Sequence, residues 1–385
     1  MRGRSEVGAL GSQMATKPQQ TAQEPSSASF SLDTAALLAE EEHGVAIAGR
    51  SPWYLAWRRL RRNYVALAFL GVFVLIVVAC ALAPVYARHV AKTGPNDNHI
   101  TENVKVAGNE KPVISQGGTY FDKKANEIRV RPVTILSPTW WQANGRFVLG
   151  ADGNGRDVAV RLLYGGRNSL KVGIGSAIIC TFASIVLALL AGYYRGPTDW
   201  IITRFFDLIW AFPVILLAIA LGSALAINGI NWGPIHISSG SLWIPTIVIS
   251  YVLIPYVGRP LRGQILSLRE KEFVEAAIAQ GASPIRVMFA EILPNIASSV
   301  LVFFTLIIAS NILTEAALSF LGAGVQPPNP SWGTLIAEGQ TRITTAPWLT
   351  IVPGLAIVLT VLSLNIFGDG LRDALDPRAK VRIEH

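Results

Sequence analysis

Charged residues are scarce in this chain of 385 residues. Only 15% of the residues are Asp, Glu, Lys or Arg, whereas 51% are hydrophobic. A soluble domain usually carries about a quarter charged residues. Lys and Arg exceed Asp and Glu by a net charge of +8, but they flank apolar runs and do not gather on one soluble surface, as they would in a DNA-binding protein. The composition therefore indicates a protein of the lipid bilayer with no nucleic-acid partner.

Cysteine and histidine are rare as well. The two cysteines, Cys80 and Cys180, lie in apolar segments, which excludes a disulfide framework, and the five histidines form no metal-binding motif. The chain contains no Gly-Lys pair, so the phosphate-binding pattern G-x-x-x-x-G-K-[ST] is absent, and neither G-x-S-x-G nor a zinc pattern occurs. We therefore expect no catalytic residue, no metal site and no cofactor bound by this chain.

Long apolar runs are abundant, in contrast. A helix of about 20 apolar residues can cross the hydrocarbon core of a bilayer. Six segments satisfy this condition: Val65 to Tyr86, Ser169 to Tyr194, Thr203 to Ile227, Leu242 to Val257, Ser298 to Leu321, and Leu349 to Phe367. The sequence thus predicts an all-α integral membrane protein with six transmembrane helices.

These spans divide the chain into parts. Residues 1–50 have the composition of a disordered cytoplasmic tail, and residues 51–63 predict an interfacial helix rich in Trp and Arg, with a plain basic flank as the alternative. The remaining parts are the first transmembrane helix (64–86), an extracytoplasmic loop (87–168) with a strand-rich insert over 96–135, a core with five spans (169–372) that includes a cytoplasmic loop (259–297), and a cytoplasmic tail (373–385).

The orientation of the spans follows from the Lys and Arg residues beside them. Basic residues lie before the first span, in the loop between the second and third spans, in the loop between the fourth and fifth spans, and after the sixth span. The two short connections on the opposite side, Asn228 to Ser241 and Gly322 to Trp348, contain a single basic residue between them, Arg342. The loop at 87–168 is basic too, but long loops translocate largely regardless of charge. Both termini are therefore predicted to be cytoplasmic.

A stripe of small residues runs along the second span. Ser176, Cys180, Ser184, Ala188 and Gly192 are spaced four apart and share one helical face. Small side chains let another helix backbone approach closely in a membrane. We expect helix packing at this stripe; a groove for a transported solute is the secondary alternative.

The loop between the fourth and fifth spans has its own helical pattern. The segment Glu270 to Gln280 is rich in helix formers, and Gly281 follows where a residue with positive φ often ends a helix. Ser283 and Pro284 then suit the cap and first position of a second helix, which runs to about Leu293. An apolar surface that suits a protein partner is expected from Phe273, Val274, Ile278, Val287, Met288 and Phe289.

At this loop the sequence resembles a known family. Glu275, Ala276 and Ala277, then Gly281, and then Leu293-Pro294-Asn295 are similar to the signature of permease subunits of bacterial ABC importers. Further similar blocks are LGADGNGRD at 149–157, YGGRNSL at 164–170, EAALSFLG at 315–322, QPPNPSWG at 326–333 and GDGLRDALDPR at 368–378. The match covers residues 51–385 and is most like the second permease of dipeptide, oligopeptide and nickel importers.

The resemblance implies a plasma (inner) membrane subunit that forms half of a pathway for di- or oligopeptides, or for a related solute such as a nickel chelate. It also implies three kinds of partner: a second homologous permease, two ATP-binding subunits that use ATP and Mg²⁺, and an extracytoplasmic solute-binding protein. The expected contact with the ATPase comprises Glu275, Ala276, Ala277, Gly281, Pro294 and Asn295. For Glu275, a charge that merely faces water is the alternative.

Three residues are candidates for the pathway or its outer gate. A carboxylate within a span is costly, so Glu315 should face the bundle interior or water. Asn311 lies one turn before Glu315, and Trp332 follows the Pro-rich turn outside the same span. Glu315 either lines the pathway or makes a structural hydrogen bond between helices, and the sequence leaves both open. A short helix, re-entrant or on the surface, is expected at Leu335–Thr345.

Two rival functions remain. A secondary transporter would couple to ions through charged groups near the bilayer midplane, where this sequence offers chiefly Glu315. A membrane enzyme would need an assembled nucleophile, base or metal set, which the sequence lacks. Copurification with an ATPase subunit would separate the importer from both rivals.

Overall fold

The computed structural model describes residues 52–375, except residue 116, residues 123–126 and residue 132. The tail predicted over residues 1–50, the first residue of the helix predicted over 51–63, and most of the tail predicted over 373–385 lie outside the described residues.

The described part is mainly helical. Its helices are α2 (Pro52–Arg62), α3 (Tyr64–Ala81), α4 (Ala83–Tyr86), η1 (Ala87–Ala91), α5 (Val158–Tyr194), α6 (Gly196–Trp210), α7 (Val214–Asn228), α8 (Trp243–Arg269), α9 (Glu272–Ala279), α10 (Pro284–Arg286), η2 (Val287–Ile292), α11 (Leu293–Phe320), α12 (Trp332–Gln340) and α13 (Trp348–Leu375). The short segments η1 and η2 are π-helical. The helix predicted over 51–63 is confirmed as α2.

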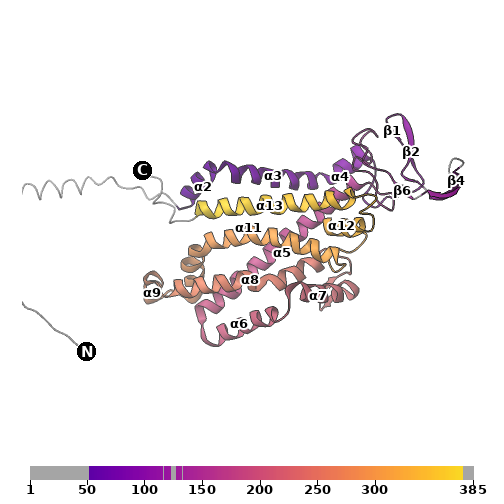
Figure 1. Cartoon of the computed structure of the whole chain (residues 1–385). Coiled ribbons are helices and arrows are strands. Elements are labelled where there is room, and N and C mark those ends of the chain that lie inside the picture. The colour runs from indigo at the N-terminus through magenta and orange to yellow at the C-terminus, as the bar shows by residue number, and fades with distance from the viewer. Residues whose placement is uncertain (1–51, 116, 123–126, 132, 376–385) are drawn as a thin grey trace, which may run out of the picture. The chain divides into compact units, whose positions relative to one another are not determined.

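Five helices are long and apolar enough to cross a membrane: α3, α5, α8, the continuous helix Pro284–Phe320 and α13. The pair α6 and α7 would make a sixth span, but the two helices meet at 86°. Figure 1 shows α3, α13, α11 and α8 running side by side, with α9 at one end of the bundle and α12 and strands β1 to β6 at the other. We call these the α9 end and the α12 end.

The third span, predicted at Thr203 to Ile227, is broken in the structure. Helix α6 ends at Trp210, and α7 begins at Val214, directly after Pro213. Proline disfavours the helical conformation of the residue before it, and the break between α6 and α7 falls at Phe212.

The fourth and fifth spans are longer than predicted. Helix α8 continues past Val257 to Arg269 with Pro255 and Pro260 inside it, so the first residues of the loop predicted at 259–297 are helical. The helix that contains α11 starts at Pro284, not Ser298, because the π-helical turn η2 precedes Pro294 and relieves the clash of its ring.

The small-residue stripe of α5 packs against α8, as predicted. All five residues of the stripe are buried. Ser184 Oγ donates a hydrogen bond to the Ile254 carbonyl (3.0 Å), and Ser250 Oγ donates to the Ser176 carbonyl (3.2 Å). At Gly192, a Cβ atom would lie 2.5 Å from Ile265. The two backbones therefore approach more closely than larger side chains would allow.

Helices α11, α13 and α3 complete the bundle on the other side of α5. Gly173 of α5 faces Ile312 of α11 with no room for a side chain, and Gly368 of α13 lies against Thr305 of α11. Gly370 of α13 lies against Ala66 of α3 in the same way. Close approach at small residues thus joins the helices in the order α8, α5, α11, α13 and α3.

The strand-rich insert predicted at 96–135 is confirmed. Its strands form antiparallel pairs, and a further hairpin connects α7 to α8. The strands are β1 (Asn103–Val106), β2 (Asn109–Pro112), β3 (Ile114–Ser115), β4 (Gly118–Asp122), β5 (Glu127–Arg131), β6 (Thr134–Ile135), β7 (Ile230–Trp232) and β8 (Ile235–Ile237), paired as β1–β2, β3–β6, β4–β5 and β7–β8.

The Arg146 guanidinium donates to both carboxylate oxygens of Glu102 (2.6 and 3.0 Å) and lowers the pKa of that carboxyl.

We predict that Gly192→Ala destabilises the protein, because the new methyl group must displace Ile265 against the packed backbone of α8. Overpacking of this kind costs about 1–3 kcal/mol. The matched control is Gly71→Ala in α3, where no described atom lies within 4 Å of the new Cβ. The midpoint of thermal unfolding should fall for Gly192→Ala and not for Gly71→Ala. Equal midpoints for the two variants would contradict the close α5–α8 contact.

Candidate functional site

The segment from α9 to η2 forms a hinged pair of short helical segments at the α9 end, and the second of them continues into the long helix Pro284–Phe320. Helix α9 ends at Ala279, and Gly281 adopts φ of +82°, a conformation that other residues rarely adopt. The Ser283 hydroxyl then accepts a hydrogen bond from the Arg286 amide and caps the next helix, which starts at Pro284. The predicted stop at Gly281 and restart at Ser283 are therefore confirmed.

The apolar surface of this pair differs from the prediction. Val274, Val287 and Met288 are buried in the core of the bundle, because α9 packs against η2 and α8. The large apolar side chains that remain exposed are Phe273, Ile278, Ile285 and Phe289. Half of the predicted set thus holds the pair onto the bundle, and Ile285, which the prediction missed, joins the exposed set.

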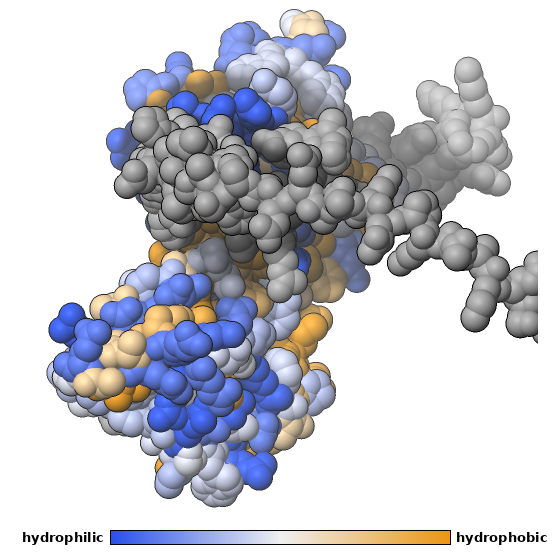
Figure 2. All heavy atoms as spheres, turned by 90° about the vertical axis from the view of Figure 1, so that its left-hand side faces the viewer, coloured by the Kyte–Doolittle hydropathy of each residue, from blue (hydrophilic) through white to orange (hydrophobic). Residues whose placement is uncertain are grey.

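The predicted contact residues for a partner lie at this same end. Glu275 and Ala276 of α9 are exposed, and Ala277 is half-buried. Pro294 and Asn295 open α11, where the Asn295 side-chain amide donates to the Glu291 carbonyl (2.6 Å), one of the carbonyls near the π-helical turn. Hydrophilic residues cover much of this end of the molecule, with apolar residues among them (Figure 2).

A polar group on α11 links α11 to α5 inside the bundle. Asn311 is fully buried, and its side-chain amide lies 2.7 Å from Ser176 Oγ of α5. Ser176 belongs to the small-residue stripe, so this hydrogen bond lies beside the α5–α8 contact. Asn311 thus contacts another helix of the same chain.

Glu315 lies one turn further along α11 and is also fully buried. Its Oε1 atom accepts a hydrogen bond from Ser319 Oγ (2.6 Å), and Ser319 Oγ in turn accepts one from the Val325 amide (2.9 Å). The hydroxyls of Ser169 and Ser331 also interact with the carboxyl group, although Oε2 has no well-aligned donor among the described residues. The carboxyl group therefore lies where α11, α5 and the start of α12 meet.

Trp332 fixes α12 to α5. The indole is buried, its Nε1 donates to the Leu162 carbonyl (3.1 Å), and the Trp332 amide donates to Ser169 Oγ (3.2 Å). Gly166 leaves space for the ring, since a Cβ there would lie 2.6 Å from it. Helix α12 begins at Trp332 and ends at Gln340, so the range predicted for a short helix, Leu335–Thr345, is displaced toward the C-terminus.

A cluster of ion pairs at the α12 end was not predicted. Arg161 of α5 is only 2% exposed and contacts Glu338 of α12 (2.9 Å) and Asp152 (3.4 Å). Arg156 contacts the same two carboxylates at 2.8 and 2.7 Å. Asp157 caps α5 and accepts hydrogen bonds from three backbone amides, which oppose the rise in its pKa caused by burial. The sequence feature that could have indicated this cluster is the charged block at 149–157.

Comparison with known sequences identifies two matching families. Residues 184–381 match the family described as binding-protein-dependent transport system inner membrane component. Residues 51–112 match the N-terminal TM domain of oligopeptide transport permease C. These matches include α2, α3, α9, η2, α11 and α12.

Individual relatives cover most of the chain. The glutathione transport system permease protein GsiD of Pectobacterium atrosepticum is 38% identical over 331 residues, which are 86% of this chain and 93% of that protein. The di/tripeptide transport system permease protein DppC of Pseudomonas aeruginosa is 35% identical over 86% of this chain and 93% of that protein. The dipeptide transport system permease protein DppC of Alkalihalophilus pseudofirmus is 44% identical over 60% and 72%.

Among solved structures, the inward-facing MetNI methionine ABC transporter is similar over 56% of this chain and 96% of that chain. The sequence identity is 16% and the TM-score is 0.46. The sequence matches, rather than this likeness, carry the assignment.

We predict that Glu315→Leu lowers the stability of the protein more than Glu315→Gln does. Leucine offers no oxygen to Ser319, and a buried polar group without its partner costs about 1–3 kcal/mol. Glutamine keeps an acceptor of nearly the same shape. The midpoint of thermal unfolding and the yield of assembled complex measure the difference. Full stability of both variants together with lost solute uptake would instead assign Glu315 to the pathway.

Proposed function

Because this chain belongs to the family of binding-protein-dependent transport system inner membrane components, we propose that it forms half of the translocation pathway of an ATP-driven peptide importer. The second half is a homologous permease. Two ATP-binding subunits bind and hydrolyse ATP with Mg²⁺, and an extracytoplasmic solute-binding protein delivers the substrate. The chain itself has no phosphate-binding motif, so the energy must come from a partner.

The observation that carries this proposal is the hinged pair of short helices at the α9 end. It exposes Phe273, Ile278, Ile285 and Phe289 beside the carboxylate of Glu275, at an end of the bundle that is mainly hydrophilic. Apolar side chains exposed among charged ones are typical of a protein interface. A short helix with such a face fits a groove in a partner protein.

The distribution of charge supports a cytoplasmic position for the α9 end. Helix α2 carries four arginines, and Arg259, Arg262 and Arg269 lie on the part of α8 that approaches α9. The connection from α7 to α8 at the opposite end has no Lys or Arg. Among the short connections, the excess of positive charge lies at the α9 end, which supports a cytoplasmic position for this end and an outer position for the strand-rich insert and α12.

Alternating access follows from this arrangement. When the ATP-binding subunits close on nucleotide, they move the paired short helices, and Val274, Val287 and Met288 transmit the movement to the bundle because they are buried in its core. The bundles then open outward to accept substrate from the binding protein, and hydrolysis restores the inward-open state. Two discrete arrangements of packed helices are the physical basis of such a switch.

The proposed substrates are short peptides. The relatives are named for dipeptide, di/tripeptide and glutathione transport, and all of these solutes are small and carry amide groups. A nickel chelate is the alternative for a chain of this type. The binding protein selects among these solutes before they reach the permease.

The burial of Asn311, Glu315 and Trp332 supports a role in the packing of the outer half of the bundle. All three are buried, and each contacts α5: Asn311 at Ser176, Glu315 at Ser169 and Trp332 at Leu162. Trp332 and the ion pairs of Glu338 hold α12 on α5, so α12 forms part of the outer gate. Of the two alternatives for Glu315, this favours the structural hydrogen bond.

We predict that Glu275→Arg uncouples the importer. The charge reversal leaves the fold intact, since Glu275 is exposed, but it places a cation in the proposed contact with the ATPase. Copurification of the ATP-binding subunits and ATP-dependent peptide uptake into proteoliposomes should both fall at least tenfold. The matched control is Glu110→Arg, the same reversal at an exposed position of β2 on the outer side, which should leave both unchanged. Normal copurification and uptake with Glu275→Arg would reject the proposed contact.

A further inference from the structure

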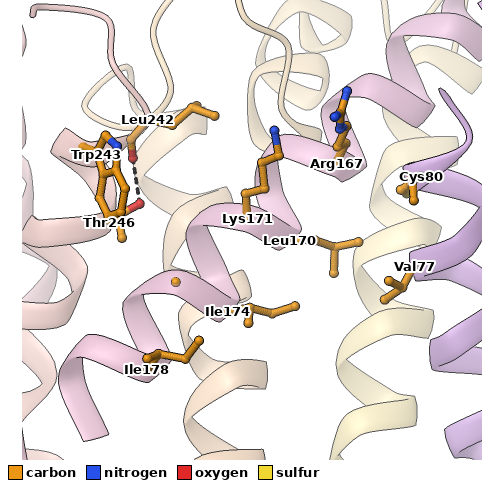
Figure 3. A pocket seen from close by; sticks show the side chains of 12 residues that line it. Val77, Cys80, Arg167, Leu170, Lys171, Ile174, Ile178, Leu242, Trp243 and Thr246 are labelled. Carbon is orange, nitrogen blue, oxygen red and sulfur yellow. Dashed lines mark hydrogen bonds between the residues drawn. The ribbon is translucent and has the colours of Figure 1, made fainter. Parts of the chain in front are cut away.

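A groove of about 620 Å³ lies between α3, α5 and α8, and its lining includes none of the candidate contact or gate residues. Its floor is one face of α5, and its walls come from the ends of α3 and α8 near the α12 end. Figure 3 shows these side chains. The lining residues are Val77, Cys80, Ala81, Arg167, Leu170, Lys171, Ile174, Gly175, Ile178, Leu242, Trp243 and Thr246. The volume is in the range of about 300–1,000 Å³ that is typical of small-molecule sites.

Two cations lie at one end of this groove. Arg167 and Lys171 are one helical turn apart on α5, so their side chains share a face, and in Figure 3 both side chains point toward the top of the view, away from Ile178. Within the described part of the chain, neither has an ion-pair or hydrogen-bond partner. Nearly all other lining side chains are apolar. The groove thus has a positive end and an apolar body.

The positive end and the apolar body of the groove lie at the membrane depths that suit a lipid headgroup and its acyl chains. Arg167 lies just before the apolar stretch of α5 that starts at Ser169, and Lys171 lies in the first turn of that stretch, so the two cations lie at the edge of the hydrocarbon core. Ile178 lies 11 residues after Arg167, or roughly 16 Å at 1.5 Å per residue. That distance is about half of a hydrocarbon core of roughly 30 Å. The apolar body therefore lies at the depth of the acyl chains of one leaflet.

A transported peptide does not fit this lining. The lining hydroxyl, Thr246 Oγ1, already donates to the Leu242 carbonyl (2.7 Å). The amide groups of a peptide would stay without partners in the apolar body, and each such group costs several kcal/mol in a dry site. A hydrocarbon chain has no such requirement, and a phosphate group suits two adjacent cations.

We propose that the groove binds one phospholipid, with its phosphate held by Arg167 and Lys171 and an acyl chain lying along Leu170, Ile174 and Ile178. The lipid fills the space between α3 and α8 and contacts both helices. In the proposed orientation of the chain the α12 end faces outward, so the lipid belongs to the outer leaflet. The lipid site itself does not require that the substrate be a peptide.

The test uses the assembled complex and palmitoyl-oleoyl phosphatidylglycerol as the probe. The double variant Arg167→Gln/Lys171→Gln removes both charges. The matched control is Arg88→Gln/Lys92→Gln, which removes two exposed cations with the same spacing at the same end of the bundle but outside the groove. Each complex is delipidated and then incubated with the probe, and native mass spectrometry measures how much probe stays bound. Thermal unfolding verifies that each variant is folded.

We expect the wild type and the control to retain one phosphatidylglycerol, and the groove variant to bind it at least tenfold more weakly. Ile174→Trp keeps both cations but fills the apolar body, and it should lose the lipid as well. Equal retention by the wild type, the control and both groove variants would overturn the proposal. The proposal would also be overturned if the double variant kept the lipid but had a raised KM for peptide uptake. That result would mean that Arg167 and Lys171 bind the substrate in the wild type. Failure of peptide transport in the wild type would leave the lipid measurement valid, so the two proposals can fail separately.

Discussion

The close contact between α5 and α8 supports most of the structure. Between helices in a bilayer there is no hydrophobic driving force, because lipid chains are as apolar as leucine. Association therefore depends on tight packing and on hydrogen bonds across the interface. The small-residue stripe of α5 provides both, through the closeness at Gly192 and the hydroxyl groups of Ser184 and Ser250. Helix α11 packs on α5 at Gly173 and α12 at Gly166, while the paired short helices extend from α8.

Features with a local cause could be predicted from the sequence. The stripe was visible because α-helical geometry places every fourth residue on one face, and the outcome, burial against another helix, needs no knowledge of the partner. The stop at Gly281 and the cap at Ser283 were visible because each depends on the backbone of a few neighbouring residues. The same holds for the strand-rich insert, whose polar and β-branched composition differs from that of the spans.

Features that depend on neighbouring helices could not be predicted in the same way. Pro213 breaks its helix, whereas Pro255, Pro260 and Pro353 lie inside continuous helices. The sequence around each proline does not reveal which outcome occurs, because packed neighbours decide whether the freed carbonyl is tolerated. Burial on the paired short helices is similar: Val287 and Phe289 are close in sequence, yet only the position of α9 and α8 makes one internal and the other external. The ion pairs of Glu338 join positions 177 and 182 residues apart, beyond any local signal.

The unbroken course of α8 has a mechanical consequence. At 27 residues the helix is roughly 40 Å long, longer than the hydrocarbon core is thick. Two residues separate one end of α8 from the start of α9, and the other end reaches Trp243 at the opposite surface. Because α8 packs on α5 along the whole stripe from Ser176 to Gly192, the two helices would move as one body when α9 is displaced. A displacement of α9 would therefore reach the opposite surface with no need for a chain of intermediate rearrangements across the bilayer.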